Sequence, residues 1–544
     1  MKLNIRGFWA MTAFLTGLSI AATAFGQKPG GTLRMYNPES IAGLSMLEEF
    51  ANAELPIMGM FNNLVMFDQH VAQNSLQTIV PDLATSWSWD EDGTDLTFQL
   101  RQGVRWHDGK PFTARDVKCT WDLYLETGPE KLRINPRKSN YYNLTAVTTN
   151  GDYEVTFHLK RPQPAFPMLL AGGFSVIYPC HVSPRDMRQH PIGTGPFKFL
   201  DFRPKEYVKV TRNSDYWKPD RPYLDGIEHT VMPDPATAVL AFIAGKFDMT
   251  RPGQLTAPLM NEIEGRVPQA ICEWTPGNVN RHLLVNRDKP PFDNPDLRRA
   301  MALSIDRQAF VDIIGQGQGH IGGVLQPPPA GLWGMPPEML KELPGYDPDV
   351  PKNRAEARQI MEKLGYGPAH QLSIKVTSQD WSIYRDPAVL LIDQLKQVHI
   401  DGELELVDTP QYYPKILRKD YSVALNLQTS GPDPDPILHL FYGCEASVNW
   451  SGYCNPDVDE LIERQSREGD PERRKPVLWE IERKLAADDA RPIIFYRNAG
   501  TCRQPYVKGL TLMGNSPFNG WRFEDVWLDN KCAKGSGPRQ WAAQ

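Results

Sequence analysis

The chain has 544 residues, of which 23% are charged, and a formal net charge of −6. A chain of this length exceeds what one hydrophobic core organises, so roughly two to four domains or subdomains are expected. Acidic and basic residues are interleaved and the net charge is negative, which argues against nucleic acid as a partner.

The N-terminus has the pattern of a secretory signal peptide, which we assign to residues 1–26. Lys2 and Arg6 precede an uncharged run from Gly7 to Phe25 that ends among small residues. A retained membrane anchor is the alternative, because the run is nearly long enough to span a bilayer. No cysteine follows the run, so lipid attachment is not expected. The sequence therefore predicts an exported, periplasmic protein without a lipid anchor.

Seven cysteines in an exported chain favour disulfide bonds. Cys444 and Cys454 flank a short loop whose closure costs little entropy, so we expect them to be bonded, with two free thiols as the alternative. Cys119 falls in a helical pattern and is expected to be a small buried apolar residue. An odd total leaves at least one thiol free or bonded outside the chain.

Strands and helices alternate from Leu372 onward, which predicts a parallel α/β sheet. Apolar residues recur at period two in the strands and at three- and four-residue spacing in the first helix. That helix is expected to begin at Pro387 with Asp386 as its cap. The β-α-β-α-β order requires right-handed crossovers between parallel strands. The predicted elements are strand 372–376, the helix from 387, strand 403–407, helix 410–419 and strand 421–427.

The region from 31 to about 280 has a different pattern. Short alternating strands are broken by proline and glycine, as in mixed and antiparallel sheets. They lie at 96–106, 154–160, 197–202 and 207–213. The sequence thus predicts two lobes of unlike structure.

Motifs for catalysis or cofactor binding fail on context. Gly317–Gly322 matches a dinucleotide fingerprint by letter, but it follows a predicted helix and precedes a proline-rich loop, where the fingerprint needs a strand and then a helix. The histidines are scattered, so no metal site is predicted. His107 is expected to be a hydrogen-bonded structural residue. We expect neither a cofactor nor an enzyme, although a hydrolase with a dispersed site is the alternative.

Several segments resemble family 5 of the extracytoplasmic solute-binding proteins, which serve ABC importers of peptides, nickel and related solutes. The likeness covers nearly all of the mature chain in the family's order. The segments are Pro81–Asp122, Gly193–Phe199, Arg212–Ile227, Gly245–Met249, Pro290–Gly317 and Asn455–Gln465.

The resemblance implies an α/β, bilobal periplasmic-binding-protein fold of the Venus-flytrap type, with an enlarged first lobe that carries an extra subdomain. The chain would cross to the second lobe near Arg281 and return near Arg497. The expected division is signal peptide 1–26, first lobe 27–280 with the extra subdomain at about 60–190, second lobe 281–502, and return to the first lobe 503–544.

The resemblance also implies the function. The protein would close on a small solute, peptide-like by family default, and deliver it to an ABC permease and ATPase complex in the inner membrane. Sugar, opine or other acidic solutes are open alternatives, as is a receptor that signals occupancy to a sensor protein. The protein is expected to act as a monomer without nucleic acid.

Ligands of open parallel sheets bind beyond the carboxyl ends of the strands, which places the candidate site in three loops. The first loop supplies aromatic side chains and a cation, the second supplies hydrogen-bonding groups, and the third, inside the predicted disulfide, forms a lip. Trp381 and Asp433 could instead serve only to cover or cap a helix. The candidates are Trp381, Tyr384, Arg385, Gln428, Thr429, Ser430, Asp433, Asn449 and Trp450.

One position departs from the family's peptide binders, which place an aspartate in the second loop to hold the peptide's amino group. By an ungapped alignment, Ser430 stands there in this chain. Asp433 could substitute through a small loop shift. If Ser430 occupies the anion position, we expect peptides with free amino termini to bind poorly, and Arg385 to hold an acidic group of the ligand.

Overall fold

The computed structural model describes residues 29–41, 43–48, 55–446, 448–516, 519 and 521–529. The predicted signal peptide and Cys532 lie outside these residues. Across the described ranges, no helix combines the length and apolar character that a membrane crossing needs.

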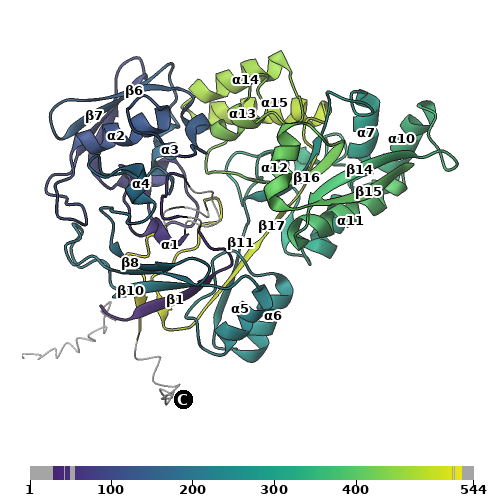
Figure 1. The fold of residues 1–544 in the computed structure, drawn as a ribbon. Helices are drawn as coiled ribbons and strands as arrows, with labels where there is room; N and C mark the ends of the chain where they lie inside the picture. Colours follow the sequence, from purple (N-terminus) through teal and green to yellow (C-terminus); the bar gives the residue numbers. More distant parts are fainter. Residues whose placement is uncertain are drawn as a thin grey trace, which may run out of the picture.

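The first lobe is built on a four-stranded sheet in which β1 pairs in parallel with β10 and the other pairs are antiparallel. Two helices lie beside this sheet and share a small apolar core with it (Figure 1). The bounds are β1 (Thr32–Asn37), β8 (Phe197–Arg203), β9 (Tyr207–Arg212), β10 (Gly226–Val231), α5 (Pro235–Ile243) and α6 (Ala257–Arg266).

The extra subdomain contains a second four-stranded sheet, antiparallel throughout, in the order β4-β5-β7-β6. The helix α2 covers this sheet. The bounds are α1 (Leu55–Met58), β2 (Val65–Phe67), η1 (Leu76–Thr78), β3 (Ile79–Pro81), β4 (Ala84–Trp89), β5 (Asp95–Leu100), α2 (Ala114–Leu125), η2 (Lys138–Tyr141), β6 (Leu144–Thr149), β7 (Glu154–Leu159), α3 (Phe166–Ala171) and α4 (Pro184–Met187).

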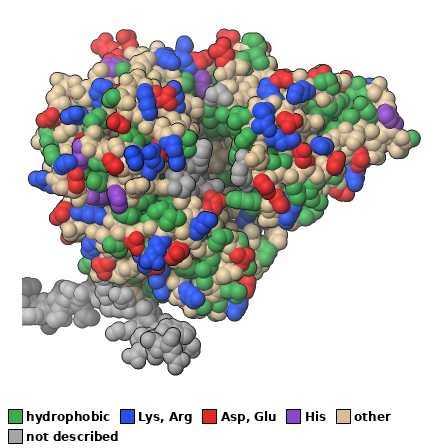
Figure 2. All heavy atoms as spheres, in the orientation of Figure 1, with side chains coloured by type: hydrophobic (Ala, Val, Ile, Leu, Met, Phe, Trp, Pro, Cys, Tyr) green, Lys and Arg blue, Asp and Glu red, His purple; other side chains and the backbone are tan. Residues whose placement is uncertain are grey.

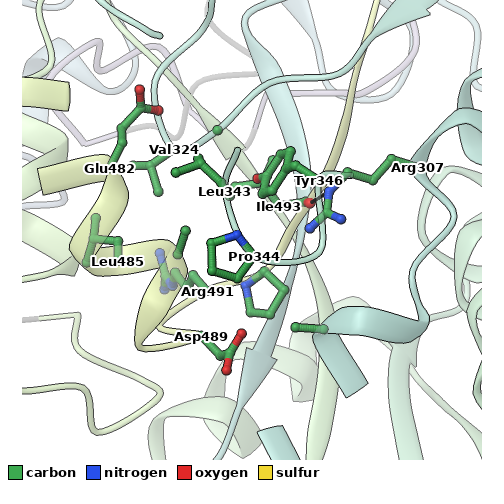
Figure 3. A pocket seen from close by; sticks show the side chains of 14 residues that line it. Arg307, Val324, Leu343, Pro344, Tyr346, Glu482, Leu485, Asp489, Arg491 and Ile493 are labelled. Atoms are coloured by element: carbon green, nitrogen blue, oxygen red, sulfur yellow. Dashed lines mark hydrogen bonds between the residues drawn. The ribbon is translucent and has the colours of Figure 1, made fainter. Parts of the chain in front are cut away.

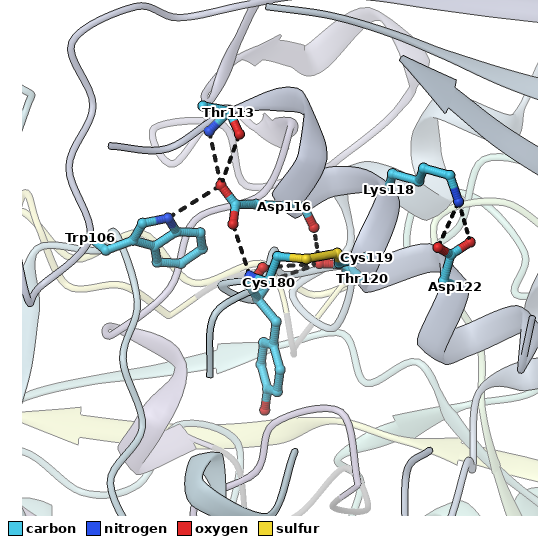
Figure 4. The surroundings of a disulfide bond; sticks show 9 residues. Trp106, Thr113, Asp116, Lys118, Cys119, Thr120, Asp122 and Cys180 are labelled. Carbon is cyan, nitrogen blue, oxygen red and sulfur yellow. Dashed lines mark hydrogen bonds and ion pairs between the residues drawn. A yellow bond between two sulfur atoms is a disulfide. The ribbon is translucent and has the colours of Figure 1, made fainter. Parts of the chain in front are cut away.

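A disulfide joins α2 to the loop before α4, between Cys119 and Cys180 (Figure 4). The buried carboxylate of Asp116 reinforces this junction by accepting hydrogen bonds from the backbone of Thr113 at 2.9 Å and of Cys180 at 2.8 Å. The expectation of a free, buried Cys119 was wrong, because its partner is 61 residues away and no local pattern marks it.

The second lobe is built on a six-stranded sheet in the order β13-β17-β12-β16-β14-β15. The predicted parallel pairing is confirmed for β14, which runs parallel to both β15 and β16. The sheet as a whole is mixed, because β12 pairs antiparallel with β16 and β17, and β13 pairs antiparallel with β17. Its strands and shorter helices are β12 (Val279–Val285), α8 (Arg307–Ala309), η3 (Phe310–Ile314), β13 (Gly319–His320), α9 (Pro337–Leu340), β14 (Leu372–Gln379), β15 (Ile400–Val407), β16 (Val423–Thr429) and β17 (Ile493–Arg497).

Helices cover both faces of this sheet, which buries its apolar strands on two sides (Figure 1). The helices α7, α10 and α11 belong to one face, and α12 to α15 to the other. Their bounds are α7 (Pro295–Ser304), α10 (Val350–Lys363), α11 (Ser382–Lys396), α12 (Thr409–Leu417), α13 (Asp435–Phe441), α14 (Pro456–Arg467) and α15 (Pro471–Ala487).

The helix α11 begins at Ser382, so the expectation that Pro387 would open it was wrong. Pro387 lies inside the helix and Asp386 is not its cap. The backbone N–H groups of Tyr384 and Arg385 both donate to the carbonyl of Trp381, which adds a turn before the proline. Burial of Tyr384 with Ala388 in the same apolar core favours this turn over the local preference of proline.

A two-stranded antiparallel ribbon of β11 (Ile271–Thr275) and β18 (Ala499–Arg503) lies where the chain passes between the lobes (Figure 1). Cys272 and Cys502 are directly opposite in the ribbon and form a disulfide. After β18 the chain re-enters the first lobe, where β19 (Val507–Lys508) pairs with β20 (Trp527–Leu528). Both crossings are therefore held side by side.

Candidate ligand site between the lobes

The surface is hollowed where the two lobes meet (Figure 2), and the first two loops predicted to bind ligand follow β14 and β16 at the hinge end of the second-lobe sheet. The third loop lies at the opposite end, because the carbonyl of Trp450 accepts a hydrogen bond from the hydroxyl of Tyr421, which precedes β16. Trp381 is 43% exposed beside the start of α11, while Tyr384 in the first turn is buried. Arg385 lies near two carboxylates, 3.5 Å from Asp380 and 3.1 Å from Asp386. Its charge is thus already offset by acidic neighbours.

Gln428 and Thr429 are the last two residues of β16, and Ser430 begins the loop that follows it. Gln428 is buried and its Oε1 accepts a hydrogen bond of 3.0 Å from Arg491, whereas Thr429 is exposed. The backbone N–H of Ser430 donates to the carbonyl of Asn278 at 2.9 Å, and its buried hydroxyl has no hydrogen-bond partner within the described part of the chain. Ser430 also lines a small pocket together with Asn515 of the first lobe.

Asp433 is occupied by an ion pair inside the second lobe. Arg474 of α15 donates to both of its carboxylate oxygens, at 2.6 and 2.8 Å, and both side chains are buried. Such a bidentate pair is the strong form of a charge-assisted hydrogen bond. A ligand ammonium would have to compete with Arg474 for this carboxylate.

The disulfide between Cys444 and Cys454 is present and closes the loop that holds Asn449 and Trp450. Asn449 bonds within the loop, because its Oδ1 accepts from the backbone N–H of Tyr453 at 3.0 Å. Trp450 packs against Phe441, with ring centroids 6.0 Å apart, and is partly buried. Both residues thus shape the loop.

A larger cavity, partly open to solvent, is walled by both lobes. One wall consists of η1 and the start of α3 in the extra subdomain. The other consists of Leu332, Trp333 and the start of α15 in the second lobe. The exposed lining is mainly apolar, and its charged wall residues include the paired Asp433 and Arg474. This space suits uncharged parts of a small solute.

Next to this cavity, the fully buried Asp435 at the start of α13 joins the lobes. Its Oδ2 accepts hydrogen bonds from two side chains of the extra subdomain, Tyr142 at 2.9 Å and Gln163 at 2.6 Å. Its Oδ1 accepts from Gln465 of α14 at 2.6 Å. Burial opposes ionisation, but hydrogen bonding and the positive charges of His439 and Arg474 outweigh it and lower the pKa of Asp435 to about 2.

A second contact between the lobes flanks Asp435. Arg161 of the extra subdomain pairs with Glu463 of α14 at 2.6 Å, and the ring of Tyr142 lies 4.3 Å from that of His439. Sequence reasoning missed these residues, since each comes from a segment without a recognisable motif. The sequence does mark the strand β12 as unusual, because three successive polar residues are rare in a central strand. These residues are Asn280, Arg281 and His282.

His107 is confirmed as a structural residue. Its Nδ1 accepts from the backbone N–H of Gly193 at 3.2 Å, and its Nε2 lies 3.1 Å from the carbonyl oxygen of Gly195. Burial lowers the pKa of His107 to about 4. Across the described ranges, no group of three or more His, Cys, Asp or Glu side chains is arranged to hold a metal ion.

A separate small pocket lies in the second lobe, beside α15 and the start of β17 (Figure 3). Glu482 borders it and accepts hydrogen bonds from the backbone N–H groups of Leu325 and Met335, both at 2.9 Å. Burial outweighs these bonds and raises the pKa of Glu482 to about 7. The folded state favours the protonated form of Glu482, so the stability of the fold depends on whether this carboxyl group is protonated.

Because its pKa is raised on folding, Glu482 stabilises the protein least where it is ionised. Its contribution falls as pH rises from about 4.5 to about 7, by up to about 3 kcal/mol. We expect Glu482→Gln to flatten the decline in unfolding free energy between pH 5 and 7.5, measured by urea denaturation. Glu480→Gln, on an exposed position of the same helix, is the control and should keep the wild-type slope. Equal slopes in all three proteins would contradict the assignment.

Comparison with known proteins agrees with this arrangement. Residues 78–449 match the model of the bacterial extracellular solute-binding proteins, family 5 Middle. The chain is 26% identical over 503 residues to di/tripeptide-binding protein 1 of Pseudomonas aeruginosa strain UCBPP-PA14, an alignment that covers 86% of this chain and 88% of that protein.

Two solved structures have the same fold. The periplasmic binding protein DppA of Helicobacter pylori, in complex with the peptide STSA, superposes with a TM-score of 0.77 at 21% identity, covering 92% of this chain and 98% of that one. The binding protein AgaA of A. tumefaciens R10, in complex with agropinic acid, gives 0.76 at 21% identity, with 92% and 99% covered. The predicted fold class, a bilobal α/β binding-protein fold with an enlarged first lobe, is confirmed.

Proposed function

Because the chain belongs to family 5 of the bacterial extracellular solute-binding proteins, we propose that it is the periplasmic receptor of an ABC importer. It captures a small solute between its two lobes and delivers it to a permease and ATPase complex in the inner membrane. It acts as a monomer and catalyses no reaction. The observation that carries the proposal is the cavity whose walls come from both lobes, because a solute bound there stabilises the closed arrangement.

The solute is held from the loops at the edge of the second-lobe sheet. Trp381 and Thr429 are exposed there, and Ser430 offers a hydroxyl without a partner among the described residues. Tyr384 and Gln428 lie buried behind this edge. We place the ligand-contacting surface at these positions and at the walls of the cavity.

The solute is small and carries an acidic group. A free peptide ammonium needs a carboxylate, because an unpaired buried charge costs several kcal/mol. In the second loop Ser430 supplies none, and Asp433 is already paired with Arg474. The relative AgaA was solved with agropinic acid, which supports an opine or another acidic, peptide-like solute over an unmodified dipeptide.

A ligand screen tests the receptor function. We expect a true solute to raise the melting temperature without being consumed, because binding to the folded state alone adds about 2.7 kcal/mol at a hundredfold excess over Kd. A thermal-shift screen should include unmodified dipeptides, opines and saccharides, with chromatography of each hit after incubation. Chemical conversion of a hit would show an enzyme, and tight binding of unmodified dipeptides would contradict the acidic solute.

A further inference from the structure

Arg281 is a buried cation at the base of the cleft. It lies in β12, whose first residue Val279 follows the hinge ribbon, and its guanidinium is 5.0 Å from the ring of Phe495 in β17. Arg497 lies two residues after Phe495 and therefore on the same face of the sheet. Arg497 also reaches the first lobe, where its Nη2 donates to the carbonyl of Leu255 at 2.9 Å. The two arginines thus stand where the lobes join.

Arg281 has no acidic neighbour in the described part of the chain. It is 5% exposed, its Nε has no hydrogen-bond partner there, and its Nη1 makes one long contact of 3.5 Å with the carbonyl of Val279. Burial, and then the like charge of Arg497, lower the pKa of Arg281 to about 9. No carboxylate contributes to its electrostatic surroundings, whereas Tyr384 does.

Two other buried arginines are compensated by carboxylates. Arg474 pairs with Asp433, and Arg522 pairs with Asp82. Taking a charge out of water costs several kcal/mol unless a counter-ion and hydrogen bonds offset it. Among the described residues, Arg281 and Arg497 lack the carboxylate that Arg474 and Arg522 have, as does Arg491, whose guanidinium lies over the ring of Phe441.

The N-terminus of α11 adds a positive potential at the same place. Tyr384, the electrostatic neighbour of Arg281, lies in the first turn of this 15-residue helix. Trp381 at the cap position makes no side-chain cap hydrogen bond, and the first turn contains no acidic residue. The free N–H groups and the helix dipole of such an end attract anions.

We infer that Arg281, Arg497 and the N-terminus of α11 form a subsite for an anionic group, namely a carboxylate carried by the transported solute. The inference rests on the proposed receptor function and names the chemistry of its ligand. This subsite, and not Arg385, would hold the acidic group of the ligand, because Arg385 already has Asp380 and Asp386 beside it. The cleft thereby selects solutes by their acidic end.

Small carboxylates test the subsite without knowledge of the solute. We expect sodium succinate to raise the melting temperature of the wild type by about 2 °C relative to sodium chloride at equal ionic strength. This is the rise expected for a ligand at about ten times its Kd. Arg281→Met should abolish this rise. Arg418→Met, an exposed position of the same lobe, is the control and should keep it, as should Arg385→Met.

A second readout needs no added carboxylate. In chloride alone, Arg281→Met should melt at or above the wild-type temperature, because the variant removes an uncompensated buried charge and keeps the apolar packing. Melting several degrees below the wild type would assign Arg281 a structural role and overturn the inference. A succinate response that is absent in the wild type, or retained in Arg281→Met, would overturn it as well.

The two proposals fail in different ways. If succinate stabilises the protein through Arg281 but every hit of the solute screen is consumed, the anion subsite stands and the receptor function fails. If acidic solutes bind without turnover and equally well to Arg281→Met, the receptor function stands and the subsite fails.

Discussion

Replacing Cys272 and Cys502 by serine is expected to lower the free energy of unfolding by about 5 kcal/mol, the largest effect of any disulfide in the described structure. This bond closes a loop of 230 residues, whereas Cys444 and Cys454 close one of 10. Longer loops lose more entropy when closed, so the Cys444→Ser, Cys454→Ser protein should lose only about 3 kcal/mol. Guanidinium denaturation of both double variants and the wild type gives the comparison.

The order of the two losses is the test of this explanation. The bond between Cys272 and Cys502 joins the two segments that connect the lobes. Its loss therefore lets these two segments move apart in the unfolded chain. Equal losses, or a greater loss for the Cys444 and Cys454 pair, would show that loop closure does not govern these bonds.

Asp435→Ala is expected to favour separation of the lobes by about 3 kcal/mol, because it leaves the buried donors of Tyr142, Gln163 and Gln465 without their acceptor. Apparent affinity for a solute that binds the closed form should fall by about 100-fold. Small-angle X-ray scattering of the unliganded variant should show a larger radius of gyration, and calorimetry with a solute from the screen should show the weaker binding.

Tyr142→Phe is the matched control for this variant. It removes one hydrogen bond to Asp435 and keeps the ring beside His439, so the expected cost is about 1 kcal/mol. Scattering from Asp435→Ala that is identical to the wild type would mean that this contact does not hold the lobes together.

Local patterns predicted the parallel part of the second-lobe sheet, but not the antiparallel pairs of β12, β13 and β17. The strand at Leu372 and the parallel order of β14, β15 and β16 follow from period-two and helical spacing within short segments. The start of α11 could not be predicted in this way, because burial of Tyr384 in the lobe core outweighs the local signal of Pro387. Cys119 and Cys180 are likewise brought together only by the tertiary fold.

The candidate site shows the same division. The loops after β14 and β16 were predictable, because ligand loops follow the carboxyl ends of parallel strands. Which charged side chains near these loops are paired with each other could not be predicted. Arg474, which occupies Asp433, is 41 residues further along the chain. The uncompensated charge of Arg281 likewise appears only when the surrounding elements are in place.

Native mass spectrometry of the protein, after incubation with an extract of small molecules from its own cells, tests the central claim most directly. We expect one bound molecule of low mass per chain, which contains a carboxylate and is released unchanged on denaturation. A protein that stays unliganded in this extract, or that releases a converted product, would contradict the receptor function.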